Sequence, residues 1–154
     1  MPPAWSNAFQ PGPEDELAPF PWVPTDRTTG VPVGAHWDAV RVPPKRAEDA
    51  YRLLGPSSGP IVANDYAGVW FFLLERGASR GWSVRGTRVP RPASLVAIPP
   101  LWVTHGGDAR WIVAPGAGLT DPADLEAALH GRAPAMRASR ARRRTPARTS
   151  AVTT

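Results

Sequence analysis

The chain has 154 residues, with 18 basic and 13 acidic side chains, a net charge of +5 and no cysteine. This length accommodates one domain with extensions, and the absence of cysteine excludes disulfides, zinc–thiolate sites and cysteine nucleophiles. The charge is uneven, because residues 131–154 contain arginine and no acid while the rest of the chain is close to neutral.

The amino terminus lacks the basic start and apolar stretch of a secretory signal. The longest apolar run, Tyr66–Leu74, is far shorter than the roughly 20 residues of a membrane-spanning helix. We therefore expect a cytoplasmic protein without a membrane segment.

Residues 1–33 are rich in proline and predict an extended arm. Its centre is the segment 19–24, Pro-Phe-Pro-Trp-Val-Pro, in which closely spaced prolines remove hydrogen-bond donors and favour polyproline-like backbone. We expect Phe20 and Trp22 to lie against the domain. The alternative is that the arm is a ligand for a proline-binding partner.

Residues 34–131 are predicted to form a single domain that begins with a strand and a helix. His36–Val42 has the β-branched content and alternation of a strand. Pro44 favours the start of a helix, since the first turn needs no N–H donor there, and Gly55 favours its end. Between them, one apolar stripe at helical spacing is formed by Ala47, Ala50, Tyr51 and Leu54.

A hairpin follows the first helix. Its predicted strands are Ile61–Ala63 and Val69–Leu74, separated by the turn formers Asn, Asp and Gly. The second strand is apolar at consecutive positions, which indicates a central strand covered on both faces. Further short strands are predicted at Ser83–Val89, Leu95–Ile98 and Trp111–Val113.

The last predicted element is a helix with clear start and stop signals. Asp121 is in the N-cap position, Pro122 in the first turn, and Gly131 follows the end. The sequence as a whole predicts an α+β fold, with a mostly antiparallel sheet of about five strands and two helices in the order β-α-β-β-β-β-α.

No catalytic residue, metal ligand or cofactor is predicted from motifs. His36 and Asp38 would share one face of a strand and so suggest half of a metal or acid–base site. No third ligand is identifiable, which favours a local hydrogen-bonded pair. The chain contains no Walker-type, dinucleotide-binding or nucleophile-elbow motif.

Residues 132–154 predict a disordered, arginine-rich tail. Its candidate nucleic-acid-binding residues are Arg132, Arg137, Arg140, Arg142, Arg143, Arg144 and Arg148. If all of them contacted phosphates, affinity would fall with salt at a log–log slope of about −5 to −6. The tail has no aromatic residue for base stacking, so binding would be non-specific. The alternative is a solubilising tail produced by GC-rich codon usage.

Several segments resemble small uncharacterised proteins of high-GC bacteria that are related to the bifunctional DNA primase/polymerase (prim-pol) domain. The resemblance covers about residues 36–130 and rests on the order and spacing of hydrophobic segments. The segments that carry it are 36–42, 59–62, 70–73 with Gly77 and Trp82, 94–100 and 111–115.

The resemblance implies a primase-type α+β fold and a link to DNA replication or repair. Enzymes of that superfamily hold two metal ions with an Asp-x-Asp pair and a later carboxylate, and use a Ser-x-His motif toward the nucleotide. Here His36 stands where the first aspartate would be needed, before Asp38, and no Ser-x-His occurs. The resemblance therefore implies a degenerate member without catalysis.

We accordingly expect a non-catalytic prim-pol-like domain whose basic tail associates with nucleic acid. The first alternative is a metal-dependent nucleotidyl-transfer enzyme with ligands around Asp38, Asp65 or Asp108, which would have to converge. The second is a protein-interaction module that uses the proline-rich arm.

Overall fold

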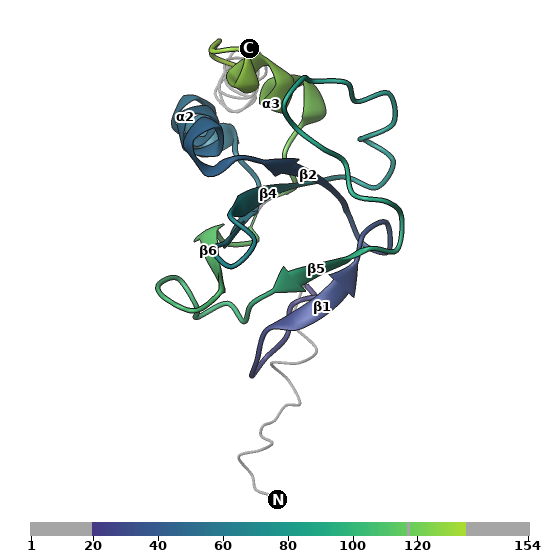
Figure 1. Ribbon diagram of the computed structural model, residues 1–154, viewed down its shortest axis with the longest axis vertical. Helices are drawn as coiled ribbons and strands as arrows, with labels where there is room; N and C mark the ends of the chain where they lie inside the picture. The colour runs from purple at the N-terminus through teal and green to yellow at the C-terminus, as the bar shows by residue number, and fades with distance from the viewer. Residues whose placement is uncertain (1–19, 117, 135–154) are drawn as a thin grey trace, which may run out of the picture.

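The computed structural model describes residues 20–116 and 118–134 (Figure 1). These residues form six strands and two α-helices, which confirms the predicted α+β class. The elements in chain order are β1 (Thr29–Pro32), β2 (Asp38–Val42), α2 (Pro44–Leu54) with the short 3₁₀ turn Gly55–Ser57, β3 (Ile61–Asn64), β4 (Val69–Leu74), β5 (Leu95–Ile98), β6 (Ala109–Val113) and α3 (Pro122–Leu129).

The strands form two antiparallel sheets rather than the single sheet that was predicted. One sheet has four strands in the order β2-β4-β3-β6, and the other pairs β1 with β5. β4 lies between β2 and β3, as its continuous apolar sequence predicted: Phe72 pairs with Val40 on one side and with Ile61 on the other.

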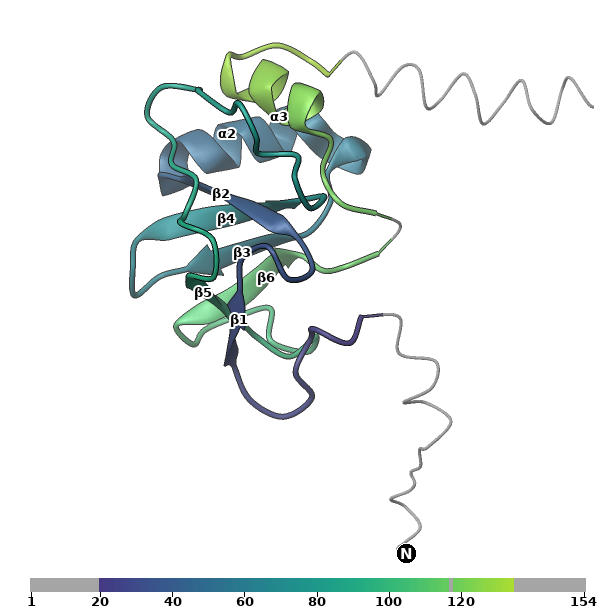
Figure 2. The same ribbon diagram turned by 90° about the vertical axis from the view of Figure 1, so that its right-hand side faces the viewer.

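The four-stranded sheet is covered on both faces (Figure 2). The helices α2 and α3 lie on one face, and β1 and β5 lie on the other. Successive residues of β4 therefore enter different parts of the core. Phe72 and Leu74 pack with the helices, while Phe71 and Leu73 pack with Val31 and other residues of the β1–β5 layer. The alternation of side chains along a strand produces this division.

Both helices begin and end at the predicted signals. α2 starts at Pro44 and is followed by Gly55, whose φ of 52° suits glycine. α3 is capped by Asp121, whose Oδ2 accepts a hydrogen bond of 3.0 Å from the N–H of Asp124. No helix in the described part of the chain is long and apolar enough to cross a membrane.

The segment preceding β2 differs from the prediction in two respects. Thr29–Pro32, within the proline-rich arm, forms β1 because Val31 and Val33 find buried positions against β5 and the large sheet. The predicted strand at His36 begins only at Asp38, since a turn closed by the hydrogen bond from Gly34 N to Trp37 O places His36 outside the ladder.

Ser83–Val89 is a loop, so the strand predicted there is wrong. Gly81 and Gly86 have φ values of 80° and 85°, which interrupt an extended chain. Side chains reinforce the turn: Trp82 Nε1 donates to Thr87 Oγ1, and that hydroxyl donates to Val84 O, each at 2.8 Å. One bridge, between Arg88 and Arg41 of β2, is the only ladder contact that this loop makes in the described structure.

The arm residue Trp22 lies against the domain, as expected. The ring of Trp22 lies 5.7 Å from that of Trp37 and 6.2 Å from that of Trp111, centroid to centroid. Phe20 contacts Trp22 edge to face. The centre of the proline-rich segment thus forms part of the packing on the β1–β5 side of the sheet.

Candidate functional site

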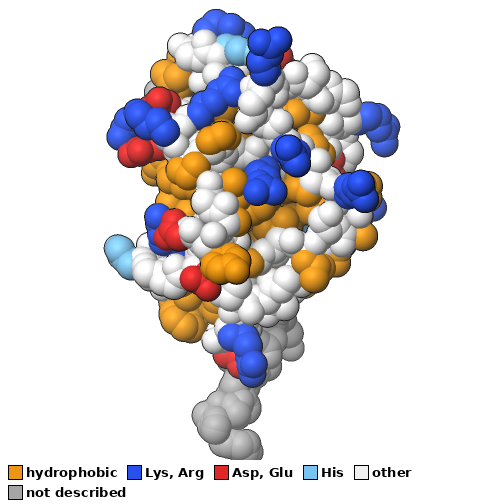
Figure 3. Space-filling model, viewed as in Figure 1, with side chains coloured by type: hydrophobic (Ala, Val, Ile, Leu, Met, Phe, Trp, Pro, Cys, Tyr) orange, Lys and Arg blue, Asp and Glu red, His pale blue; other side chains and the backbone are white. Residues whose placement is uncertain are grey.

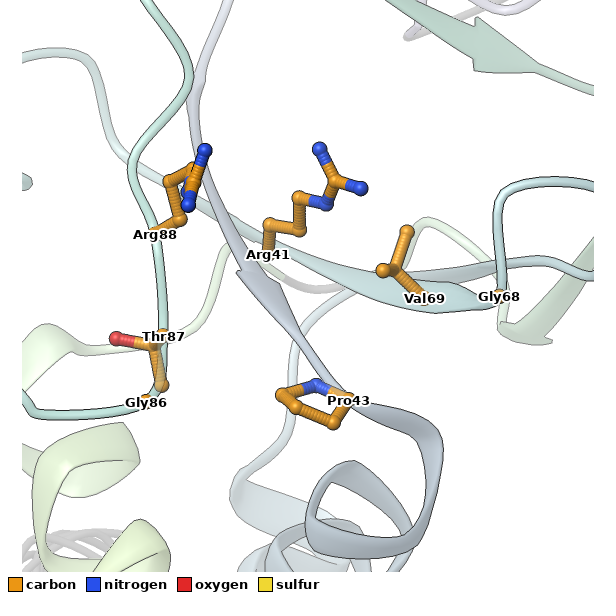
Figure 4. A pocket seen from close by; sticks show the side chains of 7 residues that line it. All are labelled: Arg41, Pro43, Gly68, Val69, Gly86, Thr87 and Arg88. Carbon is orange, nitrogen blue, oxygen red and sulfur yellow. The ribbon is translucent and has the colours of Figure 1, made fainter.

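A pocket of about 460 Å³ opens beside the carboxyl end of β2 (Figure 4). Three segments that are distant in sequence form it: the end of β2 with the proline that follows, the start of β4, and the loop between β4 and β5. The lining residues are Arg41, Pro43, Gly68, Val69, Gly86, Thr87 and Arg88. None of them is acidic, and two are arginine.

Arg41 and Arg88 are held directly opposite each other by their backbones. Arg41 N donates to Arg88 O at 2.8 Å, and Arg88 N donates to Arg41 O at 3.0 Å. Opposed residues of an antiparallel pair project their side chains to the same face. Figure 4 shows both guanidinium groups on the same side of the two chain segments.

The position of Arg41 follows from the register of the sheet. Its partner across β4 is Phe71, which packs against the β1–β5 layer, so Arg41 lies on that face too. Arg41 is half-buried and Arg88 is exposed. The pocket therefore places one partly desolvated guanidinium beside one that reaches solvent.

Neither arginine has a carboxylate partner among the residues that the structure describes. Other basic residues do: Arg52 pairs with Glu48 at 2.7 Å, and Arg110 pairs with Asp65 at 3.3 Å. On the face shown in Figure 3, basic and acidic side chains lie side by side at the left-hand edge, whereas the basic side chains near the centre have no acidic side chain directly beside them. Like charges directly opposite each other in a sheet are destabilising. The pair is therefore left without a neutralising partner among the described residues.

The remaining lining residues add one hydroxyl, that of Thr87, and no carboxylate or imidazole. The Thr87 hydroxyl already donates to Val84 O and accepts from Trp82. Arginine stays protonated and cannot act as a base. Gly86 leaves room for Arg46 of α2, since a Cβ on Gly86 would lie 2.8 Å from Arg46 Nη1. The lining thus offers cationic donors, apolar surface and one hydroxyl that is already hydrogen-bonded.

The structure assigns Asp38 a structural role and does not pair it with His36. Both the N–H and the Oγ of Ser79 donate to Asp38 Oδ2, at 3.0 and 2.6 Å. Burial raises the pKa of Asp38, but the hydrogen bonds from Ser79 and Gly77 and the charge of Arg80 outweigh it and lower that pKa below its ordinary value. His36 is exposed in the preceding turn.

The three aspartates considered for a metal site do not converge. Asp38 pairs with Leu74 at one end of β4, whereas Asp65 adjoins the other end, about 17 Å away along a six-residue strand. Asp65 and Asp108 lie in adjacent loops, since Asp65 N donates to Asp108 O at 2.7 Å. Within residues 20–116 and 118–134, no three His, Asp or Glu side chains could hold a metal ion together.

Of the candidate tail residues, Arg132 is exposed just after α3, and its N–H donates to Ala127 O at 2.8 Å. The other six, Arg137, Arg140, Arg142, Arg143, Arg144 and Arg148, lie outside the described residues.

The sequence analysis missed Arg41 and Arg88 as site residues. One signal was available: Arg41 is the single charged residue within Ala39–Val42, where the strand is otherwise apolar. Nothing local in the sequence identifies Arg88 as its neighbour.

Searches against protein-family models, curated proteins and solved structures found no match to this chain.

Proposed function

We propose that this protein is a non-catalytic, prim-pol-like domain whose arginine-rich tail associates with nucleic acid without sequence specificity. The observation that carries the proposal is the concentration of seven arginines and no acid in residues 131–154. The exposed position of Arg132 beyond α3 supports it, because the basic segment starts at the surface of the domain. Arginine binds phosphate oxygens through charge-assisted hydrogen bonds, which require no base contact.

The prim-pol relationship is proposed from the segments that resemble that family. They overlap β2, β3, β4, β5 and β6, which are five of the six strands in the described structure. The non-catalytic part of the proposal is supported by the separation of Asp38 from Asp65 and by the engagement of Asp38 with Ser79. Two-metal phosphoryl transfer needs several oxygen ligands around ions about 4 Å apart.

The tail is tested by comparing the full chain with a truncation after Pro134 in a DNA-binding titration at several salt concentrations. This end point keeps the buried Pro134 and the hydrogen bond of Arg132 to α3. Removal of the six arginines beyond it should weaken binding and reduce the magnitude of the log–log salt slope by about 4 to 5.

A matched control replaces the same six arginines by lysine, which preserves the charge. It should retain most of the affinity and the salt slope, because counterion release depends on charge rather than on guanidinium geometry. Equal affinity and salt dependence of the truncated and full chains would reject the proposal.

The first alternative, a nucleotidyl-transfer enzyme, would show Mn²⁺-dependent nucleotide incorporation that is lost in Asp38→Asn or Asp65→Asn.

The second alternative is a partner protein that binds the proline-rich arm. Such a partner would have to displace or accommodate Trp22, which packs on Trp37 and Trp111. A pull-down that compares the full chain with a variant carrying Pro21→Ala and Pro24→Ala, at the centre of the arm, separates this module from the tail.

A further inference from the structure

We infer that the pocket between Arg41 and Arg88 is a binding site for the phosphoryl group of a phosphate monoester, and that it acts independently of the arginine-rich tail. The site belongs to the folded domain, whereas the tail proposal concerns residues beyond α3. The first is a pocket with a defined lining, and the second is an electrostatic contact along a charged segment.

The arginine pair carries an electrostatic cost in the folded protein. The two reciprocal backbone hydrogen bonds, of 2.8 and 3.0 Å, fix Arg41 and Arg88 opposite each other. Their charges then repel across the ladder, and no carboxylate of the described residues forms an ion pair with either. A bound anion between the two groups converts this repulsion into two attractions.

Two guanidinium groups favour a phosphate monoester over a carboxylate as the bound anion. A carboxylate has one charge and two oxygens, which a single guanidinium satisfies in a bidentate pair. A phosphate monoester carries about −1.5 to −2 charges at neutral pH and three acceptor oxygens. It can therefore accept from both guanidinium groups at once. Two arginines without any acid in the lining match that charge and that number of acceptors.

The pocket is large enough to hold the organic part of a phosphate ester as well as its phosphoryl group. The pocket volume of about 460 Å³ is far larger than a phosphate ion and lies within the range of small-molecule sites, about 300–1,000 Å³. Pro43 and Val69 add apolar surface to the lining, and Gly68 and Gly86 add no side chain that would fill it. The pocket thus has room for an ester group next to the phosphoryl group.

The experiment is a titration of the ¹⁵N-labelled full chain with inorganic phosphate, at constant ionic strength maintained with sodium chloride. The amide resonances of Gly68, Gly86 and Thr87 should shift along one saturable curve. Arg41→Gln and Arg88→Gln should each weaken phosphate binding by about tenfold or more, the effect expected for losing one charge-assisted hydrogen-bonding group. Arg91→Gln, which removes an exposed arginine outside the pocket lining, is the matched control and should bind as the parent does.

A second readout separates a binding role from a structural one. Without phosphate, Arg88→Gln should raise the melting temperature by about 1 to 5 °C, because it removes the like-charge repulsion with Arg41. With saturating phosphate, the parent should gain thermal stability that the variant does not gain. Arg88 is exposed, and within residues 20–116 and 118–134 its hydrogen bonds are those of its backbone with Arg41, so the variant should fold.

Two sources of a phosphate monoester are distinguished by further titrations. A mononucleotide that binds as tightly as a 5′-phosphorylated oligonucleotide assigns the site to small phosphate esters. An oligonucleotide that binds the pocket only when it carries the 5′-phosphate assigns the site to a strand end. Either result supports the inference.

The inference is overturned if phosphate shifts the Gly68 and Gly86 amides no more than chloride does, or if both glutamine variants bind phosphate like the parent. A variant with serine at the six tail arginines keeps this outcome separate from the tail proposal. It should bind phosphate normally and lose DNA affinity, so failure of either idea leaves the other standing.

Discussion

Two charged residues of β2 illustrate how the surroundings of a side chain decide its role. Asp38 lies at the start of the strand and receives two hydrogen bonds from Ser79, so its charge is satisfied within the protein. Arg41, three residues later, faces Arg88 and has no acidic partner among the described residues. The hydrogen bonds to Asp38 let its charge stabilise the fold. Arg41 lies opposite another positive charge, so a bound anion would find it unneutralised.

The first prediction concerns Ser79. Ser79→Ala should lower the free energy of unfolding at neutral pH by about 1–2 kcal/mol, because the buried Asp38 carboxylate loses a charge-assisted hydrogen bond. Since the pKa of Asp38 is lowered in the folded state, this contribution is complete above the unfolded value of about 3.9. The stabilisation is lost as the pH falls through the lower pKa that Asp38 has in the folded state.

Urea unfolding from pH 7 to pH 2.5 measures both the size of this stability loss and its dependence on pH. The stability difference between parent and variant should be constant near neutrality and shrink at the acidic end. Ser83→Ala, at an exposed serine of the following loop, is the control. A stability difference that grows as the pH falls would contradict the stabilisation of ionised Asp38 by Ser79.

At the scale of elements, local signals and long-range pairing act separately. α3 is specified by its own residues, since Asp121 caps the first turn and Leu125 and Leu129 supply the buried face. β1 has no such signal, because Thr29–Pro32 includes a glycine and a proline, which are uncommon in strands. It forms because β5 and the core beneath it provide partners for Val31.

The second prediction concerns the cap of α3. Asp121→Ala should lower the free energy of unfolding by about 1 kcal/mol, since the N–H of Asp124 loses its acceptor at the first turn. Asp121→Asn keeps an acceptor oxygen and should cost much less. Chemical denaturation of the two variants makes the comparison, and equal losses would mean that the charge rather than the cap bond stabilises the helix.

At the scale of the whole molecule, one sheet separates two apolar layers. The helices close one side, and β1, β5 and Trp22 contribute to the other. Trp22 contacts Trp37, next to β2, and Trp111 of β6, so it joins the beginning of the described chain to both edges of the four-stranded sheet. The segment around Trp22 therefore belongs to the folded unit.

The third prediction tests this assignment. Trp22→Ala should lower the free energy of unfolding by about 1–3 kcal/mol, less than for a fully buried tryptophan because the ring is only half-buried. Pro21→Ala, at an exposed neighbour, should change it by no more than about 0.5 kcal/mol. Thermal and urea unfolding would show both effects, and an unchanged Trp22→Ala variant would place the segment outside the cooperative unit.

The elements with local signals were predicted closely. Val69–Leu74 and Leu95–Ile98 match β4 and β5, and the helices begin at Pro44 and Pro122 as expected. These signals, namely hydrophobic period, caps and the backbone limits of proline and glycine, act within a few residues. The α+β class followed from them.

The candidate pocket depended on contacts between distant residues. Arg41 and Arg88 are separated by a helix and two strands. Ser83–Val89 reads as a strand, although Gly86 and the preceding Gly81 make it a loop with one bridge. The sequence by itself determined the two helices, the strands β4 and β5, the absence of cysteine chemistry and the concentration of positive charge near the carboxyl end. The tertiary structure alone decided the layering of two sheets, the separation of Asp38 from Asp65 and the placement of Arg41 opposite Arg88. The reason is that strand pairing joins residues far apart in the sequence, and no local pattern indicates which residues will pair.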